Sequence, residues 1–386
     1  MKLFVFVLLI PFISCLNNGL GKTPAMGWNP HNFVNGDFND TLVRAHADLL
    51  VSLGLADLGY KYVNLDDGWQ AKTRAPDGTL TYDTKKFPNG IKAVSDYVHS
   101  KGLFFGLYSG AASLTYKNLP GSLGHEDTDA ETFASWDCDY LKYDYYKENW
   151  TSPVPERYIK MGKALNKTGR PMFYSNSGGG FSLPWIWGPT YLNSWRISLD
   201  IANKWSSITY IAAVAAEVAS FGKPGAWNDL DMLEVGNGGL TFVEEQAHFA
   251  LWAFVKSNLL LGNDLRKVTN ETLSIIGNKE IIAVNQDPLG IPATRLYASS
   301  DNHTEIWGCP VVDGYAALLW NKDSTTKTVT ANFSLFKLSG TYNVRDLYAH
   351  QDLGKFTNSF SASIPSHGVK AIKLTQVSEK FLAQEI

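Results

Sequence analysis

The sequence predicts an α/β protein, with a (β/α)8 TIM barrel followed by a small C-terminal antiparallel β-sandwich domain. Eight short apolar runs alternate with helix-like segments before residue 290, and four of these runs end on an aspartate. Strands buried on both faces read as near-continuous apolar runs, so carboxylates at the same end of several strands indicate one shared polar site. A barrel takes about 250 residues, which leaves room in 386 for one small extra domain.

The expected barrel strands are Met26–Trp28, Tyr60–Leu65, Leu103–Tyr108, Tyr140–Tyr143, Met172–Ser175, Ser194–Ile197, Gly225–Asn228 and Asn258–Leu261. The helix-like segments between them include Thr41–Asp57, Gly90–Ser100, Asp127–Trp136, Pro155–Leu165, Ile208–Ser220 and Thr241–Lys256. Beyond residue 290 the pattern changes to alternating runs separated by turn residues, which is typical of antiparallel strands. We therefore expect a signal peptide at 1–18, the barrel at 19–290, the β domain at 291–376 and a tail at 377–386.

The composition excludes some partners and suggests others. A net charge of −3 gives no reason to expect nucleic acid or an anionic membrane as partner. The 12 Trp and 18 Tyr suit carbohydrate, because sugar rings present apolar C–H faces to aromatic rings, although core packing explains most of them. The apolar N-terminus and six Asn-X-Ser/Thr sequons predict a secreted or vacuolar N-glycoprotein. With Cys15 removed, Cys138 and Cys309 are expected to be buried free thiols.

Two aspartates at separate strand ends indicate catalysis. Lys142 and Asp144 are two apart on one strand and project to the same face, and a lysine there keeps a carboxylate ionised, as a nucleophile requires. Asp200 ends a later strand, and if it lies in a drier pocket than Asp144 its pKa rises and it becomes the acid. Two such carboxylates are the minimum for glycoside hydrolysis. The alternative for Lys142 and Asp144 is a buried ion pair that only stabilises the barrel.

The adjacent carboxylates Asp66 and Asp67 are interpreted as a clamp on sugar hydroxyls. Successive side chains of a strand diverge, so both reach one site only if the strand has already become a loop. A metal site is the rival interpretation, disfavoured because Lys142 would repel a cation. No cofactor is expected, since Gly178–Gly180 lacks a phosphate-loop pattern. The histidines, including His31, are assigned surface or packing roles.

Long motifs resemble one known family. They are TPAMGW (Thr23–Trp28), GYKYVNLDDGW (Gly59–Trp69), PDGTL with KFPNGI (Pro76–Ile91), PGSLGHEDTDAETFASW (Pro120–Trp136), DYLKYD (Asp139–Asp144) and WNDLDMLEVGN (Trp227–Asn237). In this order they resemble glycoside hydrolase family 27, which holds α-galactosidases and α-N-acetylgalactosaminidases. The resemblance implies a barrel with a β-sandwich-like domain, retaining hydrolysis of galactosides, and no metal or cofactor.

The same resemblance assigns roles residue by residue. It implies Asp144 as nucleophile and Asp200 as acid/base, with Asp66, Asp67 and Lys142 holding sugar hydroxyls. Trp28 matches the aromatic wall of the sugar pocket, and Arg196 lies near the C2 substituent. The remaining substrate-binding positions implied are Tyr108, Ser177, Asp231 and Met232.

The chain also departs from the family pattern. Gly68 stands where DDCW is common, and Tyr145 follows the nucleophile where YDNC is common, so the customary disulfides are absent. Small residues at Ser177–Gly180 resemble the arrangement that accepts an acetamido group at C2. The α-N-acetylgalactosaminidase and β-L-arabinopyranosidase activities therefore stay open beside the leading α-galactosidase activity. From other classes, a non-catalytic lectin is kept and an oxidoreductase is disfavoured, and a homodimer is a candidate assembly.

Overall fold

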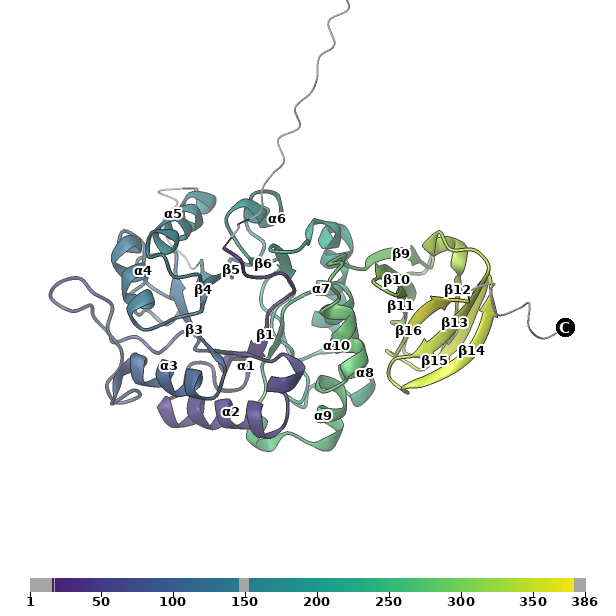
Figure 1. Ribbon diagram of the computed structural model, residues 1–386, viewed down its shortest axis with the longest axis horizontal. Helices are drawn as coiled ribbons and strands as arrows, with labels where there is room; N and C mark the ends of the chain where they lie inside the picture. Colours follow the sequence, from purple (N-terminus) through teal and green to yellow (C-terminus); the bar gives the residue numbers. More distant parts are fainter. Residues whose placement is uncertain (1–15, 17, 146–152, 378–386) are drawn as a thin grey trace, which may run out of the picture.

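The computed structural model describes residue 16, residues 18–145 and residues 153–377. Figure 1 shows a barrel with a smaller sheet domain beside it. Most of the predicted signal peptide, nearly all of the predicted tail and the sequon at Asn149 lie outside the described residues. Within them no helix is long and apolar enough to cross a membrane.

The barrel is one sheet of eight parallel strands. They are β1 (Met26–Trp28), β2 (Tyr62–Asn64), β3 (Phe104–Gly110), β4 (Tyr140–Asp144), β5 (Phe173–Asn176), β6 (Ser194–Arg196), β7 (Trp227–Asp229) and β8 (Leu259–Leu261). The order runs from β7 back to β1 and then to β8, so each strand lies beside its sequence neighbour. A parallel bridge from Leu233, just after β7, to Leu261 links the two ends. The predicted fold class is confirmed.

Helices connect the strands, and Figure 1 shows most of them around the outside of the barrel. They are α1 (His31–Val34), α2 (Asp40–Ser52), α3 (Gly90–Ser100), α4 (Glu126–Ser135), α5 (Val154–Lys167), α6 (Pro184–Trp187), α7 (Trp205–Val218), α8 (Phe242–Phe254), α9 (Asn270–Ile276) and α10 (Lys279–Asn285). The segment expected as one helix to Asp57 ends at Ser52 instead, since Gly54 adopts a left-handed φ of +72°. α8 begins with a capping box between Thr241 and Glu244.

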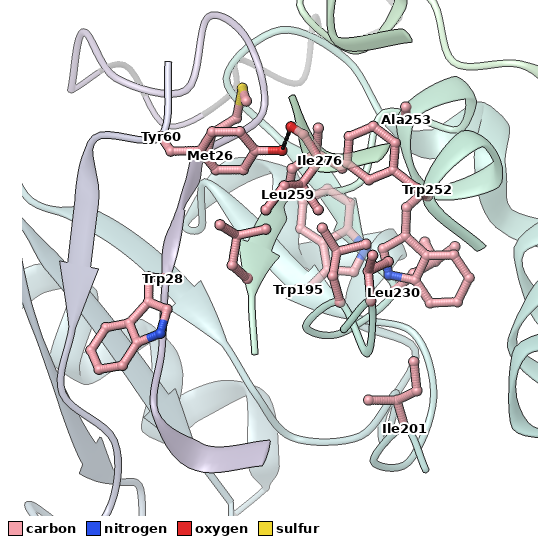
Figure 2. Packing of buried hydrophobic residues seen from close by; sticks show 14 of the residues in the cluster. Met26, Trp28, Tyr60, Trp195, Ile201, Leu230, Trp252, Ala253, Leu259 and Ile276 are labelled. Carbon is pink, nitrogen blue, oxygen red and sulfur yellow. Dashed lines mark hydrogen bonds between the residues drawn. The ribbon is translucent and has the colours of Figure 1, made fainter. Parts of the chain in front are cut away.

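The main core lies between the strands and the surrounding helices. Figure 2 shows part of this cluster, including the side chains of Met26, Leu259, Trp195, Leu230 and Trp252. The buried hydroxyl of Tyr60, in the same cluster, donates a hydrogen bond to the carbonyl of Ile276 at 2.8 Å. This packing holds the strands in register and so fixes where their carboxyl ends open.

The C-terminal domain consists of two antiparallel sheets. Its strands are β9 (Thr294–Ala298), β10 (Thr304–Val311), β11 (Gly314–Asn321), β12 (Lys327–Asn332), β13 (Thr341–Asp346), β14 (Gln351–Thr357), β15 (Ser359–Ile364) and β16 (Val369–Gln376). Six of them form one sheet in the order β14-β13-β16-β11-β10-β9, and β12 pairs with β15 in the other. Alternate residues such as Val329 and Ala331 point into a second apolar cluster between the sheets.

Helix α8 joins the two parts of the molecule. It packs against α7, α9 and α10 on the barrel and against β10, β11 and β16 of the C-terminal domain, an arrangement visible in Figure 1. Its sequence is apolar on most sides, as expected for a helix covered from both directions. The C-terminal domain is therefore packed onto the barrel rather than tethered by a linker alone.

Candidate active site

A cavity of about 650 Å³ opens at the carboxyl ends of the barrel strands, where barrel enzymes place their active sites. Ten of the eleven site residues predicted from the sequence line it, namely Asp66, Asp67, Tyr108, Lys142, Asp144, Ser177, Arg196, Asp200, Asp231 and Met232. They come from the ends of six different strands. The strand-end pattern therefore locates the cavity, and the exception is Trp28.

Asp144 is the last residue of β4 and is half-buried in the cavity wall. Its Oδ2 accepts a hydrogen bond from the Tyr108 hydroxyl at 2.8 Å, and its Oδ1 accepts one from the Tyr145 N–H at 2.7 Å. Burial raises the pKa of Asp144, and the nearby Lys142 ammonium only partly offsets the rise. The charge of Lys142 acts in the direction expected from the sequence and favours ionised Asp144, although its Nζ donates a hydrogen bond to Asp66 at 2.7 Å.

Asp200 lies on the rim of the same cavity, in the loop that follows β6. Its side chain is 83% exposed, and its Oδ1 lies 3.2 Å from Nη2 of Arg196. The surrounding protein displaces some water and raises its pKa, but the positive charges of Arg196, Lys142 and His31 outweigh this and leave the pKa below its usual value. Asp200 is therefore not in the drier environment considered from the sequence, because its loop carries it past the strand end.

The two carboxylates nevertheless belong to one electrostatic unit. The charge of Asp200 contributes to the raised pKa of Asp144, and both groups face the same cavity. The negative charge of Asp200 favours the protonated form of Asp144, because like charges disfavour double ionisation.

Asp66 and Asp67 both reach the cavity because β2 ends at Asn64, two residues earlier, and the backbone has already turned. Asp66 Oδ2 accepts from Lys142 Nζ at 2.7 Å and from Asn29 Nδ2 at 2.8 Å, and its Oδ1 lies 3.2 Å from His31 Nδ1. Asp67 Oδ2 accepts from the Lys117 N–H at 2.8 Å. The two neighbours thus differ. Asp66 is paired with cations, whereas Asp67 faces the cavity and, in the described residues, has no cation bonded to it.

This difference gives the adjacent carboxylates opposite pKa shifts. Burial raises the pKa of Asp67 to about 6. Burial acts on Asp66 as well, but the charges of Lys142 and His31 overcome it and hold the pKa of Asp66 well below its usual value. An ionised Asp67 therefore costs the folded protein stability, whereas an ionised Asp66 stabilises it.

We expect Asp67→Asn to raise the melting temperature at pH 7.5 while lowering activity. The unfolded carboxyl ionises near pH 4 and the folded one near 6, so stability is lost as pH rises between these values and the full cost, about 2–3 kcal/mol, applies above them. The amide removes this cost and can still accept the Lys117 N–H. Calorimetry at pH 7.5 and pH 4.0 measures the effect, and the gain should vanish at the lower pH.

The matched control is Asp66→Asn, one residue away and equally buried. Its carboxylate contributes stability above the unfolded pKa and loses it as pH falls, so this change should lower the melting temperature at pH 7.5. The loss is on the order of 3 kcal/mol, because Lys142 is left buried beside a neutral partner. Equal shifts of the two variants in the same direction would contradict the assignment.

Arg196 and Asp231 form a buried ion pair beneath the rim, with Nη2 and Oδ2 2.8 Å apart. Asp231 has a left-handed φ of +80°, which is unusual for a residue with a side chain and is found at functional sites. Its Oδ2 also accepts the Ile201 N–H at 2.8 Å. The strained turn after β7 thus holds the loop that carries Asp200.

Trp28 is the predicted site residue that does not line the cavity. It is fully buried, stacks on His46 with ring centroids 4.2 Å apart, and donates from Nε1 to the Asn263 carbonyl. Phe33, whose ring centroid lies 6.0 Å from that of Trp28, lines the cavity instead. Figure 2 shows Trp28 projecting from β1, apart from the other side chains drawn. Its position is behind the aromatic wall rather than on it.

Several cavity residues were not predicted. His31, assigned a packing role, lines the cavity, and the Asp66 carboxylate raises its pKa. Glu234 is buried in the wall between the side-chain amides of Asn32 and Asn237 at 2.9 and 2.5 Å, and burial raises its pKa to about 7. Both lie shortly after β1 or β7, so the strand-end rule, applied a few residues further, would have found them.

The glycines after Ser177 do not open space into the cavity. A methyl group on Gly178 would lie 2.8 Å from the Tyr158 hydroxyl, and one on Gly180 would lie 2.5 Å from the Ile197 carbonyl oxygen. Gly180 also has a left-handed φ of +81°. Only Ser177 of this loop lines the cavity. The glycines let the loop after β5 pack closely against neighbouring backbone and side chains.

The next features are the groups that could bind a metal and the two cysteines. Within residues 16, 18–145 and 153–377 no group of three or more His, Cys, Asp or Glu side chains is placed to hold a metal ion. Cys138 and Cys309 are free and buried, as expected. Burial raises the pKa of each thiol to about 12, so neither is a ready nucleophile.

Comparison with known proteins matches both parts of the chain. Residues 26–287 match the family model described as alpha galactosidase A, and residues 301–374 match the alpha galactosidase C-terminal beta sandwich domain. The α-galactosidase of Cyamopsis tetragonoloba is 48% identical over 93% of this chain and 87% of its own length. Alpha-galactosidase 3 of Arabidopsis thaliana is 47% identical over 93% of this chain and 83% of its own.

Solved structures agree with this match along nearly the whole chain. α-Galactosidase I from Mortierella vinacea superposes with a TM-score of 0.90 at 40% identity, covering 93% of this chain and 98% of that one. The α-galactosidase from Saccharomyces cerevisiae with raffinose gives a TM-score of 0.89 at 33% identity, covering 92% and 98%. The barrel, the strand-end carboxylates and the relatives converge on one conclusion: this chain belongs to the alpha galactosidase A family of glycoside hydrolases, family 27.

Proposed function

We propose that the chain is an α-galactosidase that releases terminal α-D-galactosyl residues with retention of configuration. The observation that carries this proposal is the position of Asp144 and Asp200 on one cavity that also contains Asp66, Asp67 and Lys142. A pair of carboxyls with different environments supplies a nucleophile and an acid. The three further charged groups supply ligands for sugar hydroxyls. Relatives that carry the name α-galactosidase support the sugar.

The reaction is a double displacement. An Asp144 oxygen attacks the anomeric carbon while the glycosidic C–O bond breaks, and Asp200 gives its proton to the departing oxygen. The product is a β-linked glycosyl-enzyme. Asp200, now ionised, takes a proton from water as the water oxygen attacks the anomeric carbon, and the bond to Asp144 breaks. Galactose leaves with its original α configuration.

The electrostatics of the pair support this exchange of roles. In the free site the cation Arg196 keeps the pKa of Asp200 low. A bound sugar covers the rim and displaces water there, which raises the pKa of Asp200 toward that of an acid. Esterification of Asp144 then removes a neighbouring negative charge, which lowers the pKa of Asp200 again and suits it to act as base.

Sugar recognition is assigned to the remaining cavity groups. Asp66, Asp67 and Lys142 are placed to hold hydroxyls, and Tyr108 keeps its hydroxyl on the nucleophile. The family resemblance places Arg196 near the C2 substituent, and Ser177, Asp231 and Met232 line the same cavity. Gly178 and Gly180 pack against neighbouring protein and do not line the cavity, so they do not support the acetamido alternative.

The chain is further proposed to be a secreted or vacuolar N-glycoprotein, with a signal peptide at 1–18 preceding a barrel at 19–290 and a β domain at 291–376. The first fifteen residues contain one Lys followed by an apolar stretch. All five sequon asparagines within the described residues are exposed, namely Asn39, Asn166, Asn270, Asn302 and Asn332. Exposure of the acceptor is what glycosylation requires. A mass decrease on treatment with an N-glycosidase would test it.

A substrate panel tests the activity. The purified protein is assayed on nitrophenyl α-galactoside, α-N-acetylgalactosaminide and β-L-arabinopyranoside, and NMR follows which anomer of the sugar appears first. We expect turnover of the α-galactoside with α-galactose as the first product. β-Galactose as first product would contradict retention, and turnover of the acetamido substrate alone would contradict the sugar. Saturable galactose binding without hydrolysis of any substrate would favour the lectin.

A further inference from the structure

The loop that carries Asp200, residues 197–204, is held to the barrel mainly by its middle. The Ile201 N–H donates to Asp231 Oδ2 at 2.8 Å, and the Ala202 N–H donates to the Ser207 hydroxyl in α7 at 2.9 Å. Among the described residues, the ion-pair partner of the Asp200 carboxylate is Arg196, with Nη2 at 3.2 Å. The position of this carboxylate over the cavity therefore depends both on Asp231 and on where α7 begins.

The first residue of α7 is fixed by the C-terminal domain. The Trp205 ring stacks on the imidazole of His367, with centroids 4.7 Å apart and planes at 16°. It also meets the edge of Trp320 at 5.7 Å. Such aromatic pairs contribute beyond the area they bury and define an orientation. Both partners belong to the C-terminal domain, and Trp205 is five residues after Asp200.

A second connection leads from His367 to the same loop. Its Nδ1 donates to Glu244 Oε1 at 2.6 Å, and Glu244 Oε2 accepts the Thr241 N–H in the capping box of α8. Just before that cap, Gly239 packs so closely that a methyl group on it would lie 2.3 Å from the Asn203 carbonyl oxygen. Glu244 thus holds residues 239–241 in place, and this segment packs against the Asp200 loop.

His367 is itself held rigidly. It occupies a turn with φ +58°, and its N–H donates to the Asp323 carbonyl at 3.1 Å. The side-chain amide of Asn321 donates to the carbonyls of Ile364 and Pro365 at 3.1 and 2.9 Å, which fixes the start of the turn. The imidazole is therefore presented to the barrel by a preformed turn.

We propose that His367 is a positioning residue for the acid/base step, because it fixes both the start of α7 and residues 239–241, which pack against the Asp200 loop. The C-terminal domain thereby takes part in catalysis from outside the cavity. This inference rests on the proposed function, in which Asp200 is the acid. It assigns a role to a domain that supplies no residue to the cavity lining.

The test separates acid catalysis from all other steps. His367→Ala should lower kcat/KM for an α-galactosyl disaccharide, whose leaving group needs a proton, by about tenfold. For dinitrophenyl α-galactoside, whose leaving group departs without a proton, the change should be under about twofold on the same argument. Inhibition by galactose should be unchanged. His367→Phe, which keeps a ring over Trp205, should recover part of the loss.

His350→Ala is the matched control. His350 also belongs to the C-terminal domain and also bonds a barrel glutamate through Nδ1, namely Glu280 of α10 at 2.8 Å. Glu280 does not line the cavity. This variant should lose a comparable contact between the domains and any stability it provides, while keeping the ratio of the two kcat/KM values.

The outcomes are distinct. Equal losses on both substrates in His367→Ala, in step with a lower melting temperature, would make the residue merely structural and overturn the proposal. The proposal is also overturned if Asp200→Ala loses kcat/KM on the disaccharide but not on the dinitrophenyl substrate, and neither His367 variant shows this difference. If Asp200→Ala itself shows no leaving-group effect, the acid assignment fails first and the positioning role fails with it. A selective loss with partial recovery by phenylalanine supports it.

Discussion

Replacing Asp144 by glycine is expected to abolish hydrolysis of α-galactosides, with kcat reduced ~10⁴-fold or more, because the change removes the carboxylate that forms the glycosyl-enzyme in the proposed reaction. The variant should keep its sugar-binding groups and bind galactose. Sodium azide should restore turnover of an activated aryl α-galactoside, since the small anion fits the space left by the carboxylate. Release of nitrophenol with and without azide measures the rescue.

The configuration of the azide product provides the internal control. Azide that replaces Asp144 attacks the face opposite the leaving group, so the product is β-galactosyl azide. In Asp200→Gly the nucleophile is still present, azide attacks the glycosyl-enzyme from the other face, and the product is α-galactosyl azide. Near-normal turnover of Asp144→Gly, or an α product from it, would remove Asp144 from the role of nucleophile.

The barrel and its active end were predictable from the sequence for a physical reason. Strands such as Tyr140–Asp144 are buried on both faces, so their apolar runs are visible, and the aspartate that ends each run marks the point where the chain meets water. The same rule identified Asp66 and Asp67. Their different pKa values were not predictable, because they depend on which carboxylate Lys142, from another strand, reaches.

Features of the rim were less predictable because loops have no periodicity. The exposure of Asp200 follows from the path of residues 197–204, and the burial of Trp28 follows from its stacking on His46, a residue of α2. Neither contact leaves a signal in the local sequence. Likewise nothing in the sequence distinguishes His367 from the other seven histidines, because its stacking on Trp205 arises only in the folded protein. Contacts between distant segments are decided by tertiary packing.

The second large effect expected is that of Asp200→Ala, and it depends on the leaving group. General acid catalysis contributes about 10²- to 10⁴-fold, so kcat/KM for an α-galactosyl disaccharide should fall by this amount. For dinitrophenyl α-galactoside the first step needs no proton and should be nearly unchanged. Deglycosylation without a base is then slow, so a burst of dinitrophenol should precede a low steady-state rate, and stopped-flow absorbance measures both phases.

The pH profile gives an independent check on the same variant. In the intact enzyme kcat/KM should fall as pH rises, because the positive charges around Asp200 favour its ionised form, which cannot donate a proton. Asp200→Ala should lose this alkaline limb. Glu217→Ala is a matched control, since Glu217 is also an exposed carboxylate 3.2 Å from an arginine, Arg295, but lies on α7 away from the cavity. A profile unchanged in Asp200→Ala, or altered equally in Glu217→Ala, would show that another group supplies the proton.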